Sequence, residues 1–118
     1  MDKMTKLIDQ RCEPQVTGSN PLPRDRAEEL HKQVPGWRLK EKQIATERKF
    51  CNFRQAMEFV NQVASIAEDQ NHHPDIYIYY NQVHLTLTTH KIGGLTMNDF
   101  ILAAKIDNSI VGIQPAKI

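Results

Sequence analysis

Residues 52–70, NFRQAMEFVNQVASIAEDQ, carry the clearest helical pattern in the 118-residue chain. Asn52 is a typical helix N-cap, and Gln55 stands three positions later, where a capping-box partner belongs. Apolar residues then recur at steps of three and four, which predicts an amphipathic helix ending at about residue 69 or 70. We expect its inward face to comprise Phe53, Met57, Val60, Ala64 and Ala67, flanked by Ala56, Val63 and Ile66.

Two β-rich runs follow this helix. Residues 76–80, IYIYY, are aromatic and β-branched, and residues 82–88, QVHLTLT, alternate polar and apolar side chains. Asn81-Gln82 supplies a turn, so the two runs predict an antiparallel hairpin with one face in water. Gly93-Gly94 then closes the second strand.

A last helix is expected after Thr96, because Thr96 and Asp99 form a helix-start pattern. Ile101, Leu102 and Val111 make its apolar surface wider than one sheet face requires, which indicates a partner subunit. The inward positions of this helix are Phe100, Ala103, Ala104, Ile106, Ile110 and Ile113.

Residues 24–33 are compatible with a helix that turns Ala27 and Leu30 inward and stops at Pro35-Gly36. Residues 37–49 alternate and predict a hairpin with a thin apolar side. The order is therefore helix, hairpin, helix, hairpin, helix. This order predicts an α+β two-layer sandwich, in which helices cover one face of a four-stranded antiparallel sheet.

Residues 12–23 are rich in proline and polar side chains, so we expect residues 1–23 to form a flexible N-terminal tail before a single domain at 24–118. The net charge of +1 gives no electrostatic footprint for direct nucleic-acid or membrane binding. Cys12 and Cys51 share no motif spacing, which favours a reducing compartment. No stretch has signal-peptide character or about 18 consecutive apolar residues, so we expect a cytoplasmic protein.

The stretch Asn71-His72-His73-Pro74-Asp75 has no explanation in helix periodicity. The helix before it presents partial negative charge at its C-terminal end, which favours a protonated imidazole. Pro74 keeps His73 extended and so fixes the direction of both rings. A third histidine, His90, ends the last strand and lies on its polar face with His84 if the strand stays regular.

Each of these features has a simpler explanation. His31 and His84 are expected to be ordinary surface histidines, Glu68 a solvated side chain, and Asp99 a helix N-terminal carboxylate. Histidines with a nearby Glu or Asp could instead hold zinc. Adjacent histidines in an extended chain point to opposite sides, however, and neither cysteine adds a ligand at a useful spacing.

The pattern Glu68-x-x-x-His72-His73-Pro74, followed by Tyr80, His90 and Asp99, resembles the signature of the pterin-4a-carbinolamine dehydratases. The segments PGWRL, RKFCNFRQAMEFVNQVA and YNQVHLTLTTHKIGGLTMNDFILAAKID are similar to the same family. The resemblance covers about residues 24–108. It implies dehydration of a 4a-hydroxytetrahydropterin to quinonoid dihydropterin in tetrahydrobiopterin recycling, with no cofactor and no metal.

The resemblance also implies roles for the site residues. His72 and His90 would be the acid/base pair, and His73 would mainly bind and orient the pterin or share the acid role. Glu68 would set the charge or tautomer of a neighbouring imidazole, and Asp99 would do so at His90 or contact the pterin. Pro74 and Tyr80 would support the site. The sequence departs from the family at Asn71, often an acid, and Ile76, commonly a tryptophan, which affects substrate detail.

The family resemblance leaves other functions open. Animal members also serve as dimerisation cofactors of a homeodomain transcription factor, so a non-catalytic module is one alternative. A pterin enzyme of molybdopterin metabolism is another. In each case the expected assembly is a homodimer or a homotetramer.

Overall fold

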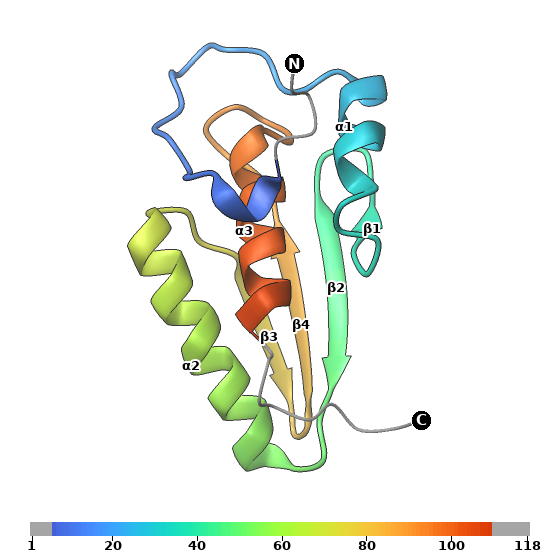
Figure 1. Ribbon diagram of the computed structural model, residues 1–118, viewed down its shortest axis with the longest axis vertical. Helices are drawn as coiled ribbons and strands as arrows, with labels where there is room; N and C mark the ends of the chain where they lie inside the picture. The colour runs from blue at the N-terminus through green and yellow to red at the C-terminus, as the bar shows by residue number, and fades with distance from the viewer. Residues whose placement is uncertain (1–5, 110–118) are drawn as a thin grey trace.

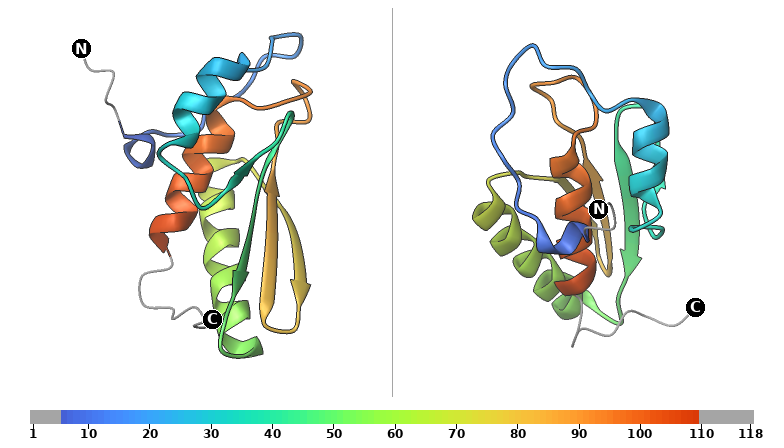
Figure 2. Two further views of the ribbon diagram at one scale, coloured as in Figure 1. Left: turned by 90° about the vertical axis from the view of Figure 1, so that its right-hand side faces the viewer. Right: turned by 45° about the horizontal axis from the view of Figure 1, so that its top comes forward.

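The computed structural model describes residues 6–109 of the chain and has the predicted α+β architecture (Figure 1). Helices pack on one face of a four-stranded antiparallel sheet with strand order β1-β2-β4-β3, and Figure 2 shows the other face uncovered. None of the helices in residues 6–109 is long and apolar enough to cross a membrane. The elements are η1 (Leu7–Asp9), α1 (Arg24–His31), β1 (Arg38–Leu39), β2 (Ile44–Lys49), α2 (Phe53–Gln70), β3 (Asp75–Tyr79), β4 (Gln82–Leu87) and α3 (Met97–Ser109).

The register of the central strands explains which residues form the core. Ile44 of β2 pairs with Leu87 of β4, and alternate residues from there point toward the helices. Val83, Leu85 and Leu87 are all fully buried, as the alternation predicts. The β3–β4 turn lies one residue earlier than expected, at Tyr80 and Asn81, because Tyr79 already pairs with Gln82.

The predicted inward face of α2 is wrong by about one residue of rotation. Phe53 is 51% exposed and Ala64 is also exposed. Apolar residues occupy half of the positions of this helix and are spread over several faces, so periodicity alone did not fix its rotation. The helix is rotated so that Phe59 is buried, with its ring centroid 5.1 Å from that of Phe50. The buried series is Ala56, Phe59, Val63, Ala67 and Gln70.

The N-terminal segment differs most from expectation. Leu7, in the short 3-10 helix η1, is fully buried, and η1 packs against α3. Figure 1 shows the segment running across α3 toward α1. Ile101 and Leu102, the apolar surplus from which a partner was inferred, are buried within this one chain. The third residue of that inference, Val111, lies outside the described residues, as do Ile110 and Ile113 of the expected inward face.

Candidate active site

The paired histidines lie where α2 gives way to β3. Asn71 ends α2 with φ 56° and ψ 40°, a left-handed conformation that asparagine tolerates better than most residues. Its N–H and that of His72 both bond to the carbonyl oxygen of Ala67, the latter at 3.2 Å. His73 then precedes Pro74, and the chain enters β3. The backbone of this corner therefore holds both histidines in place.

His72 is paired with a buried carboxylate. Its Nε2 lies 2.6 Å from Oδ1 of Asp99, which is fully buried near the start of α3. The other carboxylate oxygen accepts the backbone N–H of Thr96 and the hydroxyl of Thr89, both at 2.9 Å. Asp99 is thus a helix-capping carboxylate, as predicted, and an imidazole partner as well. The carboxylate contacts His72, whereas the resemblance implied a role at His90 or at the pterin.

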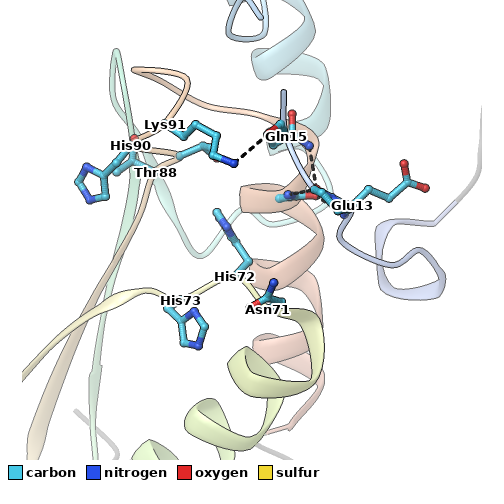
Figure 3. A pocket seen from close by; sticks show the side chains of 11 residues that line it. Glu13, Gln15, Asn71, His72, His73, Thr88, His90 and Lys91 are labelled. Atoms are coloured by element: carbon cyan, nitrogen blue, oxygen red, sulfur yellow. Dashed lines mark hydrogen bonds between the residues drawn. The ribbon is translucent and has the colours of Figure 1, made fainter. Parts of the chain in front are cut away.

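His73 has a different environment. Its Nε2 lies 2.7 Å from Oε2 of Glu68, one turn back on α2. The two side chains are 52% and 78% exposed, so solvent screens their interaction. His72 turns toward α3 and His73 toward α2, and the two rings project in different directions in Figure 3. Glu68 therefore orients an open imidazole, whereas Asp99 holds an enclosed one.

His90 comes from the loop after β4. The regular strand ends at Leu87, but Thr89 is buried against Gly94 and His90 is exposed, so the alternation continues. In Figure 3 the ring of His90 points away from that of His72. Both nevertheless border the same hollow.

One cavity of about 350 Å³ joins the three histidines (Figure 3). Its size is within the range of small-molecule sites. Its walls come from the α2–β3 corner, the loop after β4, the start of α3 and the N-terminal segment. The lining residues are Glu13, Pro14, Gln15, Asn71, His72, His73, Thr88, Thr89, His90, Lys91 and Asn98.

The remaining predicted site residues lie outside this lining. Glu68 contacts the imidazole of His73, Asp99 contacts that of His72, and Pro74 follows His73 in the chain. Tyr80 lies in the β3–β4 turn, at the opposite end of β3 from His73, and is 68% exposed with φ 53°. The structure thus separates Tyr80 from the histidine cavity.

The two histidines expected to be ordinary surface residues are also outside the cavity. A ring nitrogen of His31 contacts the carbonyl oxygen of Trp37. His84 lies on the uncovered face of the sheet, where its ring meets that of Tyr79 edge-on at 5.0 Å. Within residues 6–109, no group of three or more His, Cys, Asp or Glu side chains is placed to hold a metal ion.

Sequence reasoning missed the wall formed by Glu13, Pro14 and Gln15. These residues were assigned to a loose tail, and their contacts to Lys91 and Asn98 cross most of the chain. Local patterns hold no information about such pairings. One signal pointed to these contacts: Lys91 follows His90 and Asn98 precedes Asp99, so both lie next to predicted site residues.

Comparison with known proteins gives a consistent result. The family model described as pterin 4 alpha carbinolamine dehydratase matches residues 20–109. A Rubrobacter xylanophilus protein named "Putative pterin-4-alpha-carbinolamine dehydratase" is 44% identical over 88% of this chain and 98% of its own. A Nitrosomonas eutropha protein of the same name is 43% identical over 94% of this chain and 99% of its own.

Solved structures agree with the fold. The crystal structure of a Brucella melitensis protein titled transcriptional coactivator/pterin dehydratase has a TM-score of 0.72 and 33% identity, and covers 75% of this chain and 97% of that one. A pterin dehydratase-like protein titled a RuBisCO assembly factor has a TM-score of 0.53 over 66% of this chain and 89% of that one, and at 20% identity it shows the fold alone. The chain belongs to the pterin 4 alpha carbinolamine dehydratase family.

Proposed function

We propose that this protein removes water from a 4a-hydroxytetrahydropterin to give a quinonoid dihydropterin, with its histidines as proton donors and acceptors. The observation that carries this proposal is the His72–Asp99 pair at the edge of a cavity shared with His73 and His90. Relatives similar over nearly their whole length carry the dehydratase name.

The reaction needs little more than proton transfer. The C4a hydroxyl is a poor leaving group until it accepts a proton. Electrons from the pterin ring then fill the C4a centre as the C–O bond breaks, water departs, and a ring nitrogen loses a proton. Histidine suits both steps, since its ordinary pKa of about 6.5 allows it to give and take protons near neutral pH.

His72 is the residue best placed for the acid role. Its Nε2–H donates to Asp99, so Nδ1 is the nitrogen that can serve a ligand. Asp99 fixes this tautomer and the orientation of the ring, as a buried carboxylate does for a catalytic histidine. The protonated ring donates from Nδ1 to the departing hydroxyl.

His90 is the proposed base. Its exposed loop position at the edge of the cavity allows it to pass a proton to water after taking it from the pterin. His73, held by Glu68 but open to solvent, binds and orients the pterin ring. The proposed roles follow burial: the most enclosed imidazole, that of His72, serves the C–O bond that breaks, and the two more exposed ones serve deprotonation and binding.

A homodimer or homotetramer is proposed as the assembly. Among residues 6–109, β3 is an edge strand whose outer side pairs with no other strand. Its side chains Tyr77, Ile78 and Tyr79 are 55%, 39% and 57% exposed. A second copy pairing along this edge would cover both features. Light scattering coupled to size-exclusion chromatography measures the assembly, and a monomer would contradict it.

The dehydration assay tests the proposed function directly. Purified protein is mixed with freshly generated 4a-hydroxytetrahydrobiopterin, and loss of the carbinolamine is followed by ultraviolet absorbance. We expect acceleration that EDTA does not reduce, and a large loss in His90→Ala, whose exposed side chain is not needed for folding. A rate equal to the uncatalysed one would leave the non-catalytic cofactor role. Activity only on a molybdopterin precursor would assign the protein to molybdopterin metabolism instead.

A further inference from the structure

We propose that residues 12–15, here named the strap, position the substrate, and that Asn98 and Lys91 are positioning residues that hold the strap over the cavity. This inference rests on the proposed function. It adds a wall that lies outside the resemblance on which the histidine site was predicted. The strap is tied at three points to the elements that carry the catalytic histidines.

The first tie joins the strap to α3. The Asn98 side chain accepts the backbone N–H of Glu13 at 2.9 Å and donates to the carbonyl oxygen of Glu13 at 2.7 Å. This reciprocal pair satisfies both main-chain groups of Glu13 with one amide. Asn98 is 6% exposed and directly precedes Asp99, the partner of His72. The bonds therefore anchor the strap to the first turn of α3, beside Asp99.

The second tie joins the strap to the loop after β4. Lys91 donates from Nζ to the carbonyl oxygen of Gln15 at 3.1 Å, and Lys91 follows His90 in the chain. Figure 3 shows this contact spanning from the His90 loop to the strap. The bond links the wall that carries the proposed base to the wall formed by the N-terminal segment.

The third tie joins the strap to the end of α2. The N–H of Cys12 donates to Oε1 of Gln70 at 2.8 Å, and Gln70 is 5% exposed. Gln70 is the last residue of α2, two positions before His72. The strap thus contacts each of the three chain segments that supply His72, His90 and Asp99.

The strap contributes shape rather than proton transfer. In Figure 3 the carboxylate of Glu13 points away from the histidines, and the amide of Gln15 donates to the carbonyl of Glu13 at 3.0 Å. A wall of this kind limits how the pterin can lie and keeps it against the imidazoles. If the strap is held closed in only a fraction of molecules, apparent affinity falls by that fraction.

The experiment compares two variants, each of which removes side-chain hydrogen bonds to a different part of the N-terminal segment. Asn98→Ala removes both bonds to Glu13 beside the cavity. Gln33→Ala is the matched control, because Oε1 of Gln33 accepts the N–H of Leu7 far from the cavity lining. We expect Asn98→Ala to raise KM about 3- to 10-fold with kcat and its pH profile kept within about twofold. Gln33→Ala should leave KM within about twofold while lowering the thermal midpoint.

A second readout separates strap movement from direct contact between Asn98 and the substrate. Cys12 in the strap is half-buried and Cys51 is exposed, so alkylation of Cys12 relative to Cys51 reports strap opening. We expect iodoacetamide to label Cys12 several-fold faster in Asn98→Ala than in the wild type. Bound 7,8-dihydrobiopterin should slow labelling of Cys12 in the wild type and leave Cys51 unchanged.

The outcomes are distinct. An unchanged KM in Asn98→Ala, or a raised KM with no change in Cys12 labelling, would overturn the strap proposal while leaving the dehydratase in place. Wild-type protein without dehydratase activity would remove the proposed function. In that case, slower labelling of Cys12 with bound pterin would still show that the strap covers a pterin site. Equal labelling with and without the pterin would overturn the strap proposal as well.

Discussion

The two walls of the histidine cavity are built from opposite kinds of contact. The wall at the α2–β3 corner depends on shorter separations in sequence, five residues for Glu68 with His73 and 27 for His72 with Asp99. The strap wall depends on pairs separated by 58 residues for Cys12 with Gln70 and by 85 for Glu13 with Asn98. The chemical groups therefore come mostly from local structure, and the enclosure comes from tertiary packing. Substitutions in the two walls should have different signatures.

The largest effect on activity is expected at the corner wall, in His72→Gln. Glutamine can still donate to Asp99, so the buried carboxylate keeps a partner, but it cannot transfer a proton. We expect kcat to fall by about 10²–10⁴-fold, because a general acid is lost. The thermal midpoint should change little. Stopped-flow dehydration kinetics and thermal unfolding measure both quantities, and a loss of less than about tenfold in kcat would contradict the role of His72.

The next largest effect is a loss of stability on substitution of Leu7 in the N-terminal segment. Leu7→Ala removes a fully buried side chain from the core between η1 and α3. We expect a loss of about 2–5 kcal/mol in the free energy of unfolding, as for other buried leucines. Urea unfolding measures it, with Val16→Ala as the control because Val16 is 72% exposed. Equal stability of the two variants would mean that the segment does not pack on α3.

A smaller effect is expected at the exposed ion pair of the corner wall. Glu68→Gln removes the charge beside His73 but keeps a side chain that can hydrogen-bond. Exposed pairs of this kind contribute about 0–1 kcal/mol, so kcat/KM should fall by no more than about fivefold. Steady-state kinetics at low and high salt measure the change. A loss as large as that of His72→Gln would contradict the minor, orienting role given to His73 and Glu68.

The last effect appears only at high pH and concerns Cys12 in the strap. Burial, and secondarily the charge of Asp99, raises the pKa of the Cys12 thiol from its ordinary 9.0 to about 11. The folded protein therefore keeps a proton that the unfolded chain has lost, and stability should fall as pH rises from about 9 to about 11. Cys12→Ser removes this titration and serves as the control. Urea unfolding at pH 8 and 10.5 should show a steeper decline for the wild type, and parallel declines would contradict the burial of the thiol.

The sequence predicted the fold well where the signals are local. Asn52 caps α2 through the N–H of Gln55 at 2.9 Å, and Thr96 with Asp99 begins α3. The alternation of β4 and the ends of α2 also followed from the pattern, because periodicity and caps act over a few residues. The three histidines were found from their spacing and the family resemblance.

What the sequence could not predict depends on long-range packing. The rotation of α2 was set by Phe59 meeting Phe50, and the partner of Asp99 was set by how the α2 corner docks on α3. The cover of α3 is the clearest case. Ile101 and Leu102 indicated a missing partner, and the chain's own Leu7 lies against that helix. No periodicity within either segment specifies that pairing.

The most direct test of the central claim is a double-mutant cycle between His72 and Asp99. kcat is measured for the wild type, His72→Gln, Asp99→Asn and the double variant, with thermal unfolding to confirm that each is folded. If Asp99 acts through the imidazole of His72, the double variant will be about as slow as the His72→Gln variant alone. Losses that multiply would mean that the two residues act independently, and would contradict the account.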